Sequence, residues 1–330
     1  MGNILRRLAV VVTAVWLAGC MAGDIPFPQL EAKYANAASR YMTTEDGLRV
    51  HYRDEGPRNA PAIVLVHGFA ASLHAWEPWA ERLKGDYRVV TLDLPGHGLT
   101  RAPADYQMST AGNVAVVDEL TRRLGVGRFV LAGNSMGGAV AWSYALAHPE
   151  RLDGLVLVNA AGGPSTARSS NGPVAFKLLG NPAGRMLLRN IDPRPLANGG
   201  LKKAYVDEAL VTDALVDRYV ELARAPGHRG LLTSRSGERT ATPRAAFATI
   251  GTPTLVMVGL QDHVIAPASS RSFAEAIPGA RLVTYATGGH VPMEQLPDES
   301  ARDLRAFLEA LPRAASSGRA VGAATPAMRN

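Results

Sequence analysis

Six short apolar runs recur along the chain, each dominated by Val, Leu and Ile with little sign of an exposed face. Strands that are hydrophobic on both faces belong inside a parallel sheet that helices cover on both sides. Stretches of helical periodicity separate most of these runs, which predicts an α/β fold with a mostly parallel central sheet and helices on both faces. The runs are 62–66, 88–92, 128–132, 155–158, 254–258 and 282–285, and the helical stretches are 75–83, 110–124, 138–147, 270–276 and 301–311.

Two departures from this alternation organise the chain. Residues 41–43 and 48–53 flank Asp46-Gly47, a strong hairpin signal, so an antiparallel hairpin is predicted at the start of the folded part. Between residues 164 and 249, prolines interrupt short helical pieces and no buried strand is evident. We interpret this stretch as a helical cap inserted into a core formed by residues 41–163 and 250–313.

The most informative motif is Gly133-Asn134-Ser135-Met136-Gly137-Gly138. An apolar strand leads into it and an Ala-rich helix leaves it, and a sharp strand–turn–helix of this kind presents a serine hydroxyl at the end of the sheet. Glycines at the turn allow strand and helix to approach closely, and the helix N-terminus favours negative charge. Ser135 is therefore the predicted nucleophile. The alternative, a glycine-rich turn with an incidental serine, is disfavoured by this context.

A serine hydroxyl becomes nucleophilic only when a base takes its proton. His290 follows the last apolar run in a Gly-Gly-His loop, and none of the other seven histidines has a better loop position. Asp262 lies just beyond the run 254–258, at the carboxyl end of a strand where ligands meet open α/β sheets. We predict Asp262 as the acid that orients His290. Asp153 is the reserve carboxylate, although it precedes its strand and so lies at the wrong end.

Stabilising an oxyanion needs two backbone donors near the nucleophile. The N–H of Met136 directly follows Ser135, and the N–H of Phe69 lies in the loop after the first buried run, with Ala70 as its neighbour. Both donors are backbone N–H groups, so their ability to bind an oxyanion depends on backbone geometry and not on the side chains. His67 in the same loop is interpreted as a structural hydrogen-bonding residue.

Taken together, these motifs resemble the α/β-hydrolase superfamily over residues 41–311. The resemblance rests on His67-Gly68-Phe69, Asp93-Leu94-Pro95-Gly96-His97-Gly98, the motif around Ser135, Gly259-Leu260-Gln261-Asp262 and Gly289-His290. It implies the chain order nucleophile, acid, base, a structural role for the loop 93–98, a helical cap, and no cofactor or metal.

The resemblance leaves three functions open: two hydrolytic activities and one non-catalytic binding role. Serine at position 135 favours carboxylic-ester hydrolysis, since haloalkane dehalogenases and epoxide hydrolases carry aspartate there. A carbon–carbon hydrolase of the meta-cleavage type often shares Gly-Asn-Ser-Met-Gly-Gly, but Val291 stands where that family usually has tryptophan. Some proteins of this fold are non-catalytic binding modules, because fold alone does not establish activity.

The N-terminus carries a basic start and an apolar run, residues 8–18, that ends in Leu17-Ala18-Gly19-Cys20. This resembles a bacterial lipobox and implies a signal peptide over residues 1–19 with lipid attachment at Cys20. A tether over 20–40 would follow, and Met21 in place of Asp would direct the exported lipoprotein to the outer membrane. A conventional secretory signal with an incidental Cys20 is the alternative. The Ala-, Ser- and Gly-rich tail, 314–330, is predicted to be disordered.

Charge excludes one class of partner. The formal net charge of +6 falls to +4 when residues 1–19 are removed with Arg6 and Arg7, and the basic residues are scattered without interleaved aromatics. That pattern is typical of an ordinary surface and not of nucleic-acid binding. A small-molecule ester and, through the lipid anchor, a membrane remain as the expected partners; no pattern predicts the oligomeric state.

Overall fold

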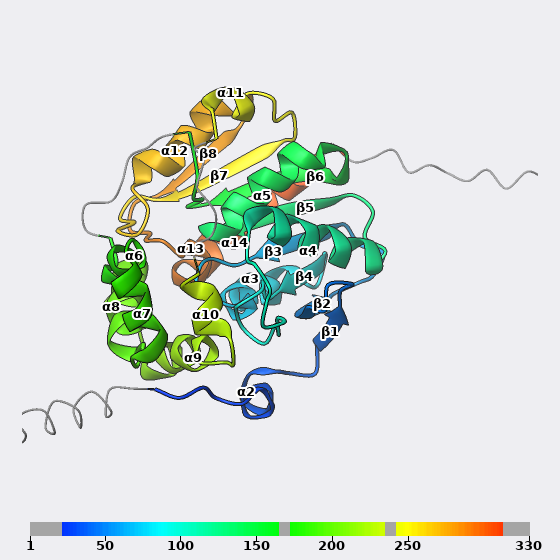
Figure 1. Ribbon diagram of the computed structural model, residues 1–330. Coiled ribbons are helices and arrows are strands. Elements are labelled where there is room, and N and C mark those ends of the chain that lie inside the picture. The colour runs from blue at the N-terminus through cyan, green and yellow to red at the C-terminus, as the bar shows by residue number, and fades with distance from the viewer. Residues whose placement is uncertain (1–21, 165–171, 235–241, 313–330) are drawn as a thin grey trace, which may run out of the picture.

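An eight-stranded sheet forms the centre of the protein, whose computed structural model describes residues 22–164, 172–234 and 242–312 (Figure 1). Its strand order is β1-β2-β4-β3-β5-β6-β7-β8. β2 pairs antiparallel with β1 and β4, and all the other pairs are parallel, which confirms the predicted sheet and its leading hairpin. The strands are β1 (Ser39–Thr43), β2 (Arg49–Glu55), β3 (Ala62–Val66), β4 (Arg88–Leu92), β5 (Phe129–Asn134), β6 (Leu152–Val158), β7 (Thr254–Gly259) and β8 (Arg281–Tyr285).

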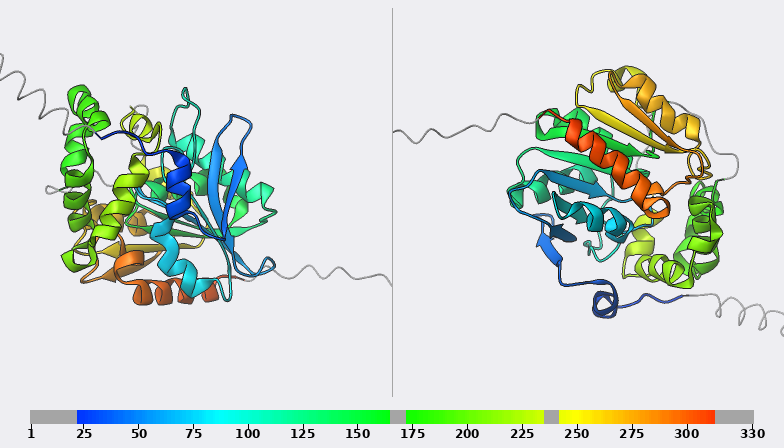
Figure 2. Two further views of the ribbon diagram at one scale, coloured as in Figure 1. Left: turned by 90° about the horizontal axis from the view of Figure 1, so that it is seen from below. Right: turned by 180° about the vertical axis from the view of Figure 1, so that it is seen from behind.

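Helices cover both faces, because alternate residues of each central strand point to opposite sides. Val64 and Val66 of β3 pack in the core under α4 (Thr110–Arg123), α5 (Met136–Ala147) and α12 (Pro267–Ala276). Ile63 and Leu65 pack on the other side, against η1 (Leu73–Trp76), α3 (Glu77–Leu83) and α14 (Pro297–Ala310). Figure 2 shows α14 crossing this second face when the molecule is seen from behind.

β8 departs from the sequence prediction. Its run looked like a strand buried on both faces, but Leu282 is 41% exposed and only Tyr285 of the strand is fully buried. The reason is position: β8 pairs only with β7 and ends the sheet, so its outer side has no neighbouring strand.

The cap consists of α6 (Val174–Leu179), α7 (Pro182–Asn190), α8 (Arg194–Tyr205), η3 (Glu208–Leu210), α9 (Asp213–Ala223) and α10 (His228–Leu232). The described residues between 172 and 234 contain no strand, as expected for a helical insert. The insert ends before residue 249, however. α11 (Arg244–Phe247) lies beside α12 (Figure 1). Its Phe247 packs edge-on against Trp142 of α5 and Phe273 of α12.

The segment before the sheet is not the extended tether that we predicted for residues 20–40. It contains α2 (Phe27–Tyr34), whose Leu30 is 1% exposed and packs with Leu99, Leu222 and Ala225. Pro28 in the first turn is compatible with a helix start, because proline there removes no internal hydrogen bond. The sequence did not predict this short amphipathic helix, because two prolines lie close together at its start. Since α2 is packed on the domain, folded structure begins well before Tyr41.

The predicted signal peptide with Cys20 and the predicted disordered tail, 314–330, lie outside the described residues. Within the described part of the chain, no helix is both long and apolar enough to cross a bilayer.

The packing of α2 on the cap and the core can be tested by measuring the free energy of unfolding of two variants. Leu30→Ala should lower the free energy of unfolding by about 2 to 4 kcal/mol, since it removes a fully buried side chain and leaves a cavity. Gln29→Ala, one residue away on the exposed side of the same helix, should change it by no more than about 0.5 kcal/mol. Denaturant titration of both variants makes the comparison. Equal effects would mean that α2 does not pack on the cap and the core.

Candidate active site

The turn between β5 and α5 holds Ser135 in a strained conformation, with φ 53° and ψ −116°. Its backbone is tied on both sides: the N–H donates to the Val158 carbonyl at 3.1 Å, and its own carbonyl accepts from Ala161 at 2.9 Å. A side chain at position 133 would collide with the Gly137 carbonyl, and one at position 137 with the Val66 carbonyl. Glycine at both positions is therefore what lets the helix leave the strand so sharply.

Strain of this kind is confined to one part of the described structure. Its non-glycine residues with positive φ are Ala70, Ser135, Asn159 and Val206. Ala70 lies in the loop after β3, Asn159 directly follows β6, and Val206 follows α8 and packs where a side chain at Gly289 would be. Residues in rarely populated backbone regions cluster at functional sites. Their gathering around Ser135 marks this end of the sheet as the candidate site.

His290 and Asp262 meet in the geometry predicted from the sequence. The His290 Nδ1–H donates to Asp262 Oδ2 at 2.7 Å, and both residues are buried. The other Asp262 oxygen accepts the backbone N–H groups of Val264 and Ile265 at 2.7 and 2.9 Å. One oxygen thus anchors the turn after β7 while the second orients the imidazole, leaving Nε2 as the acceptor. Asp153 instead pairs with Arg128 at the other end of the sheet.

Two buried asparagines hold the His290 loop to the strand ends. The Asn134 side-chain amide donates to the His290 carbonyl at 2.9 Å. The Asn159 amide donates to the carbonyls of Gly289 and His290 at 2.9 and 3.1 Å, and its oxygen accepts the N–H of Gly259 at 3.1 Å. The backbones next to Ser135, Asp262 and His290 are thereby joined in one hydrogen-bonded unit.

The cap and α13 (Pro292–Gln295) support the same loop from the other side. The His290 N–H donates to the Ala204 carbonyl of α8 at 2.7 Å, and Gln295 accepts the Gly289 N–H at 2.8 Å. Glu294 of α13 pairs with Arg218 of α9 at 2.8 Å. The position of His290 therefore depends on the cap as well as on the core.

The loop after β3 carries one of the two predicted backbone donors, Phe69, and α5 carries the other, Met136. Gly68 packs so closely on the elbow that a Cβ would approach Asn134 and the Ser135 Cβ at 3.0 and 3.2 Å. Phe69 lines the same cavity as Ser135. The Met136 N–H is the first of α5, and the first amides of a helix have no acceptor within it.

His67 shapes this loop through hydrogen bonds. Its Nδ1–H donates to the Gly68 carbonyl at 2.8 Å, and its Nε2 accepts the Leu94 N–H at 3.0 Å. Complete burial lowers the pKa of His67, so the ring stays neutral, as one donor and one acceptor require. The structural interpretation of His67 agrees with these contacts.

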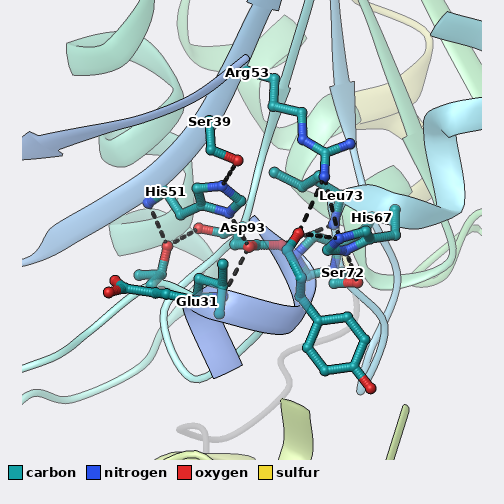
Figure 3. Close-up of polar contacts among 12 residues, drawn as sticks. Glu31, Ser39, His51, Arg53, His67, Ser72, Leu73 and Asp93 are labelled. Atoms are coloured by element: carbon teal, nitrogen blue, oxygen red, sulfur yellow. Dashed lines mark hydrogen bonds and ion pairs between the residues drawn. The ribbon is translucent and has the colours of Figure 1, made fainter. Parts of the chain in front are cut away.

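Asp93 lies at the centre of the adjoining polar cluster (Figure 3). Its carboxylate accepts from His51 Nδ1 at 2.7 Å, from the Leu73 N–H at 2.7 Å and from the Leu99 N–H at 2.9 Å. Burial alone would raise the pKa of Asp93, but the hydrogen bond and the charge interaction with His51 hold it well below its usual value. The loop 93–98, predicted to be structural, is fixed by this buried carboxylate.

The same cluster contains a second serine–histidine–aspartate series. Ser39 Oγ lies 2.9 Å from His51 Nε2, and His51 in turn bonds Asp93. The side chains of His51 and Asp93 are fully buried, Ser39 also accepts the Asn36 N–H at 3.1 Å, and none of the three lines the cavity at Ser135. The series joins β1, β2 and the residue that follows β4, and it serves as a comparison for the site at Ser135.

A cavity of about 210 Å³ lies between the cap and the end of the sheet. Ser135 and His290 form part of its wall, and most of the remaining wall is apolar and comes from the cap. A larger depression, about 430 Å³, lies over α4 far from these residues and has no serine, cysteine or strained turn in its lining. The cap contributes Ala175, Phe176, Leu179, Leu188, Leu196, Ala197, Leu201 and Leu232 to the wall of the first cavity.

Sequence reasoning missed the asparagines. Asn134 lies inside the recognised motif, but only its position at the end of β5 and opposite the His290 carbonyl gives it a role. Asn159 follows β6 as Asp262 follows β7. Its position directly after a predicted strand was the sequence feature that could have identified it as a site residue.

The geometry agrees with the comparisons to known proteins. Residues 61–183 and 210–296 match the family model for the alpha/beta hydrolase fold, and the chain belongs to this family.

Its relatives have several activities. The chain is 31% identical to the pimeloyl-[acyl-carrier protein] methyl ester esterase of Stenotrophomonas maltophilia, over 76% of this chain and 94% of that one. It is 30% identical, over 77% and 90% of the two chains, to the 2-hydroxy-6-oxononadienedioate/2-hydroxy-6-oxononatrienedioate hydrolase of Burkholderia vietnamiensis. The match to mouse epoxide hydrolase 4 is 36% identical but spans only 36% of this chain and 34% of that protein. The solved structure of a membrane phospholipase A is 26% identical with a TM-score of 0.70, covering 95% of this chain and 100% of that one.

Proposed function

We propose that this protein is a serine hydrolase that cleaves carboxylic esters, with Ser135 as nucleophile, His290 as general base and Asp262 as the acid that orients it. The observation that carries the proposal is the 2.7 Å bond from His290 to Asp262, together with the cavity that both His290 and Ser135 line. Serine, not aspartate, stands at the elbow, so an acyl-enzyme is the covalent intermediate.

The reaction follows from the roles of these groups. Ser135 Oγ attacks the ester carbonyl carbon while His290 Nε2 takes its proton, and the buried Asp262 carboxylate stabilises the imidazolium that forms. The oxyanion is placed against the N–H groups of Phe69 and Met136 at the α5 N-terminus. His290 then protonates the departing alcohol. Water, deprotonated by His290, attacks the acyl-enzyme and releases the acid.

The cavity supports a substrate with an apolar acyl part. Its wall is supplied mainly by aliphatic side chains of α6, α7 and α8 together with Phe69 and Phe176. Apolar walls with a few convergent polar groups are typical of small-molecule sites. The relative from Stenotrophomonas maltophilia is named as an ester hydrolase, which agrees with this choice.

Carbon–carbon bond hydrolysis is the second candidate, favoured by the relative from Burkholderia vietnamiensis and by the Gly-Asn-Ser-Met-Gly-Gly elbow. Val291, which lines the cavity directly after His290, is the departure that weighs against it. A non-catalytic binding role is the third reading, and it requires that Ser135 be unreactive.

The serine that reacts can be identified by a matched pair of variants. Ser135→Ala should lower kcat for nitrophenyl esters by about 10⁴-fold or more, because the covalent route is lost. Ser39→Ala removes the serine beside His51 and Asp93 and should leave most of the activity. Rates on an acyl-length series and on a meta-cleavage dienoate show which reaction is faster. Full esterase activity in Ser135→Ala would contradict the assignment, and a preference for the dienoate would move it to the second candidate.

We also propose that Cys20 carries a lipid and anchors the exported protein, as the sequence Leu17-Ala18-Gly19-Cys20 suggests. Cys20 is the single cysteine of the chain. Two signals give stable membrane attachment where one acyl chain is marginal, and a lipoprotein cysteine carries more than one chain. The likeness to a membrane phospholipase A over 95% of this chain is in keeping with a membrane location. Outer-membrane delivery, from Met21 after the cysteine, is part of this proposal.

Replacement of the thiol tests the anchor. In a bacterial host with lipoprotein processing, the wild-type protein should fractionate with the outer membrane, and its N-terminal peptide should carry acyl mass on Cys20. Cys20→Ser should lack that mass and shift toward the soluble fraction. Met21→Ala is the matched neighbour and should behave as the wild type. An unmodified wild-type N-terminus would show that Cys20 follows an ordinary export signal.

A further inference from the structure

Exposed apolar side chains gather on two neighbouring helices of the cap. In the described part of the chain, the large hydrophobic residues with the greatest exposure are Val174, Phe176, Met186, Leu187, Leu210 and Leu282. The first four lie on α6 and α7, and Met186 at 69% is the most exposed of all. We call these four residues the cap patch. Exposing a cluster of apolar side chains to water is unfavourable, and apolar patches of this kind mark interaction sites.

The charged residues of α6 and α7 have one sign, and the first acidic residue after them is Asp192. Residues 172–191 contain Lys177, Arg185 and Arg189 and no Asp or Glu. Lys177 and Arg189 are exposed, whereas Arg185 is partly buried and donates to the Leu179 carbonyl at 3.0 Å. α7 therefore places exposed apolar residues between basic ones, which is the pattern of helices that lie in the interface of a membrane.

The described chain also begins beside the cap patch. The Ala22 N–H donates to the carbonyl of Asn190, the last residue of α7, and the Asn190 side chain bonds the Met186 carbonyl at 2.8 Å. From there the chain follows the cap toward α2 (Figure 1). Ile25 bonds the Arg224 carbonyl at 2.8 Å and Asp24 pairs with Arg229 at 2.7 Å. Ala22, the first described residue, thus lies at the end of α7.

The other side of the same two helices forms the cavity wall. Ala175, Leu179 and Leu188 line the cavity that contains Ser135, and Phe176 lines it while remaining 43% exposed. Only α6 and α7 therefore separate the cap patch from the cavity at this point.

We propose that the cap patch and its basic residues form a surface that docks on an anionic lipid bilayer. Val174, Phe176, Met186 and Leu187 enter the boundary between headgroups and acyl chains, and Lys177 and Arg189 meet the lipid phosphates. The cavity wall then faces the bilayer. This goes beyond the proposed ester hydrolysis, and the contact is made by folded cap residues, so it does not depend on a lipid at Cys20. A second copy of the chain is a poorer occupant, because two such surfaces would bring like charges together.

The orientation can be measured with single thiols. In a full-length Cys20→Ser background the chain has no cysteine, so Met186→Cys and Leu282→Cys each introduce one exposed position for an environment-sensitive fluorophore. Leu282 is the matched control, because it is 41% exposed but lies on the edge strand β8, away from the cap. Both proteins share the same N-terminus, so a difference between them reports on the folded surface.

With phosphatidylglycerol-containing vesicles, the probe at position 186 should shift to the blue and be quenched by brominated lipid, while the probe at 282 should show neither change. Added salt should reduce the response, since part of the attraction is electrostatic. Met186→Glu with Leu187→Glu should weaken vesicle binding about tenfold or more while activity on a soluble ester is kept, and Leu282→Glu should not. Equal responses at the two positions, or none at 186, would overturn the proposal. A shift at 186 on raising protein concentration without vesicles would assign the cap patch to self-association and overturn it as well.

Discussion

Close contact between β5, α5 and the loop after β3 is the constraint on which the site depends. The glycines at 133 and 137 leave no room for a side chain, so the chain reverses from strand to helix within one residue and forces Ser135 to positive φ. Strain at such a position persists only when the surroundings over-determine it. The bonds from Ser135 to the ends of β6 and the following turn supply that support.

The same end of the sheet is then completed by long-range hydrogen bonds. Asn134 and Asn159 connect two adjacent strand ends to the His290 loop, and Asp262 divides its oxygens between a turn and the imidazole. Because α8 also bonds the His290 backbone, the cap both forms the wall of the cavity and fixes the proposed base. Movement of the cap would therefore change access to the cavity and the position of His290 together.

The sequence predicts this arrangement where a reactive side chain directly follows a run of strand-like apolar residues. The runs at β3 and β4 are apolar on both faces, and Ser135, Asp262 and His290 each follow a strand, so the sheet itself brings them together. α2 was hidden because Pro26 and Pro28 obscure a short amphipathic helix whose buried Leu30 packs on Leu99, Leu222 and Ala225, far away in the sequence. β8 was misjudged because its apolar run does not reveal which strand is at the edge. The roles of Asn134 and Asn159 depend on residues more than 100 positions away, which no local pattern records.

The central claim is that this environment activates one serine, Ser135, and leaves Ser39, beside His51 and Asp93, inert. The most direct measurement is the site of covalent modification after brief treatment of the folded protein with a fluorophosphonate, read by mass spectrometry of its peptides. The account predicts a single adduct, on the peptide that contains Ser135. An unmodified protein, or an adduct at Ser39 or another serine, would contradict it.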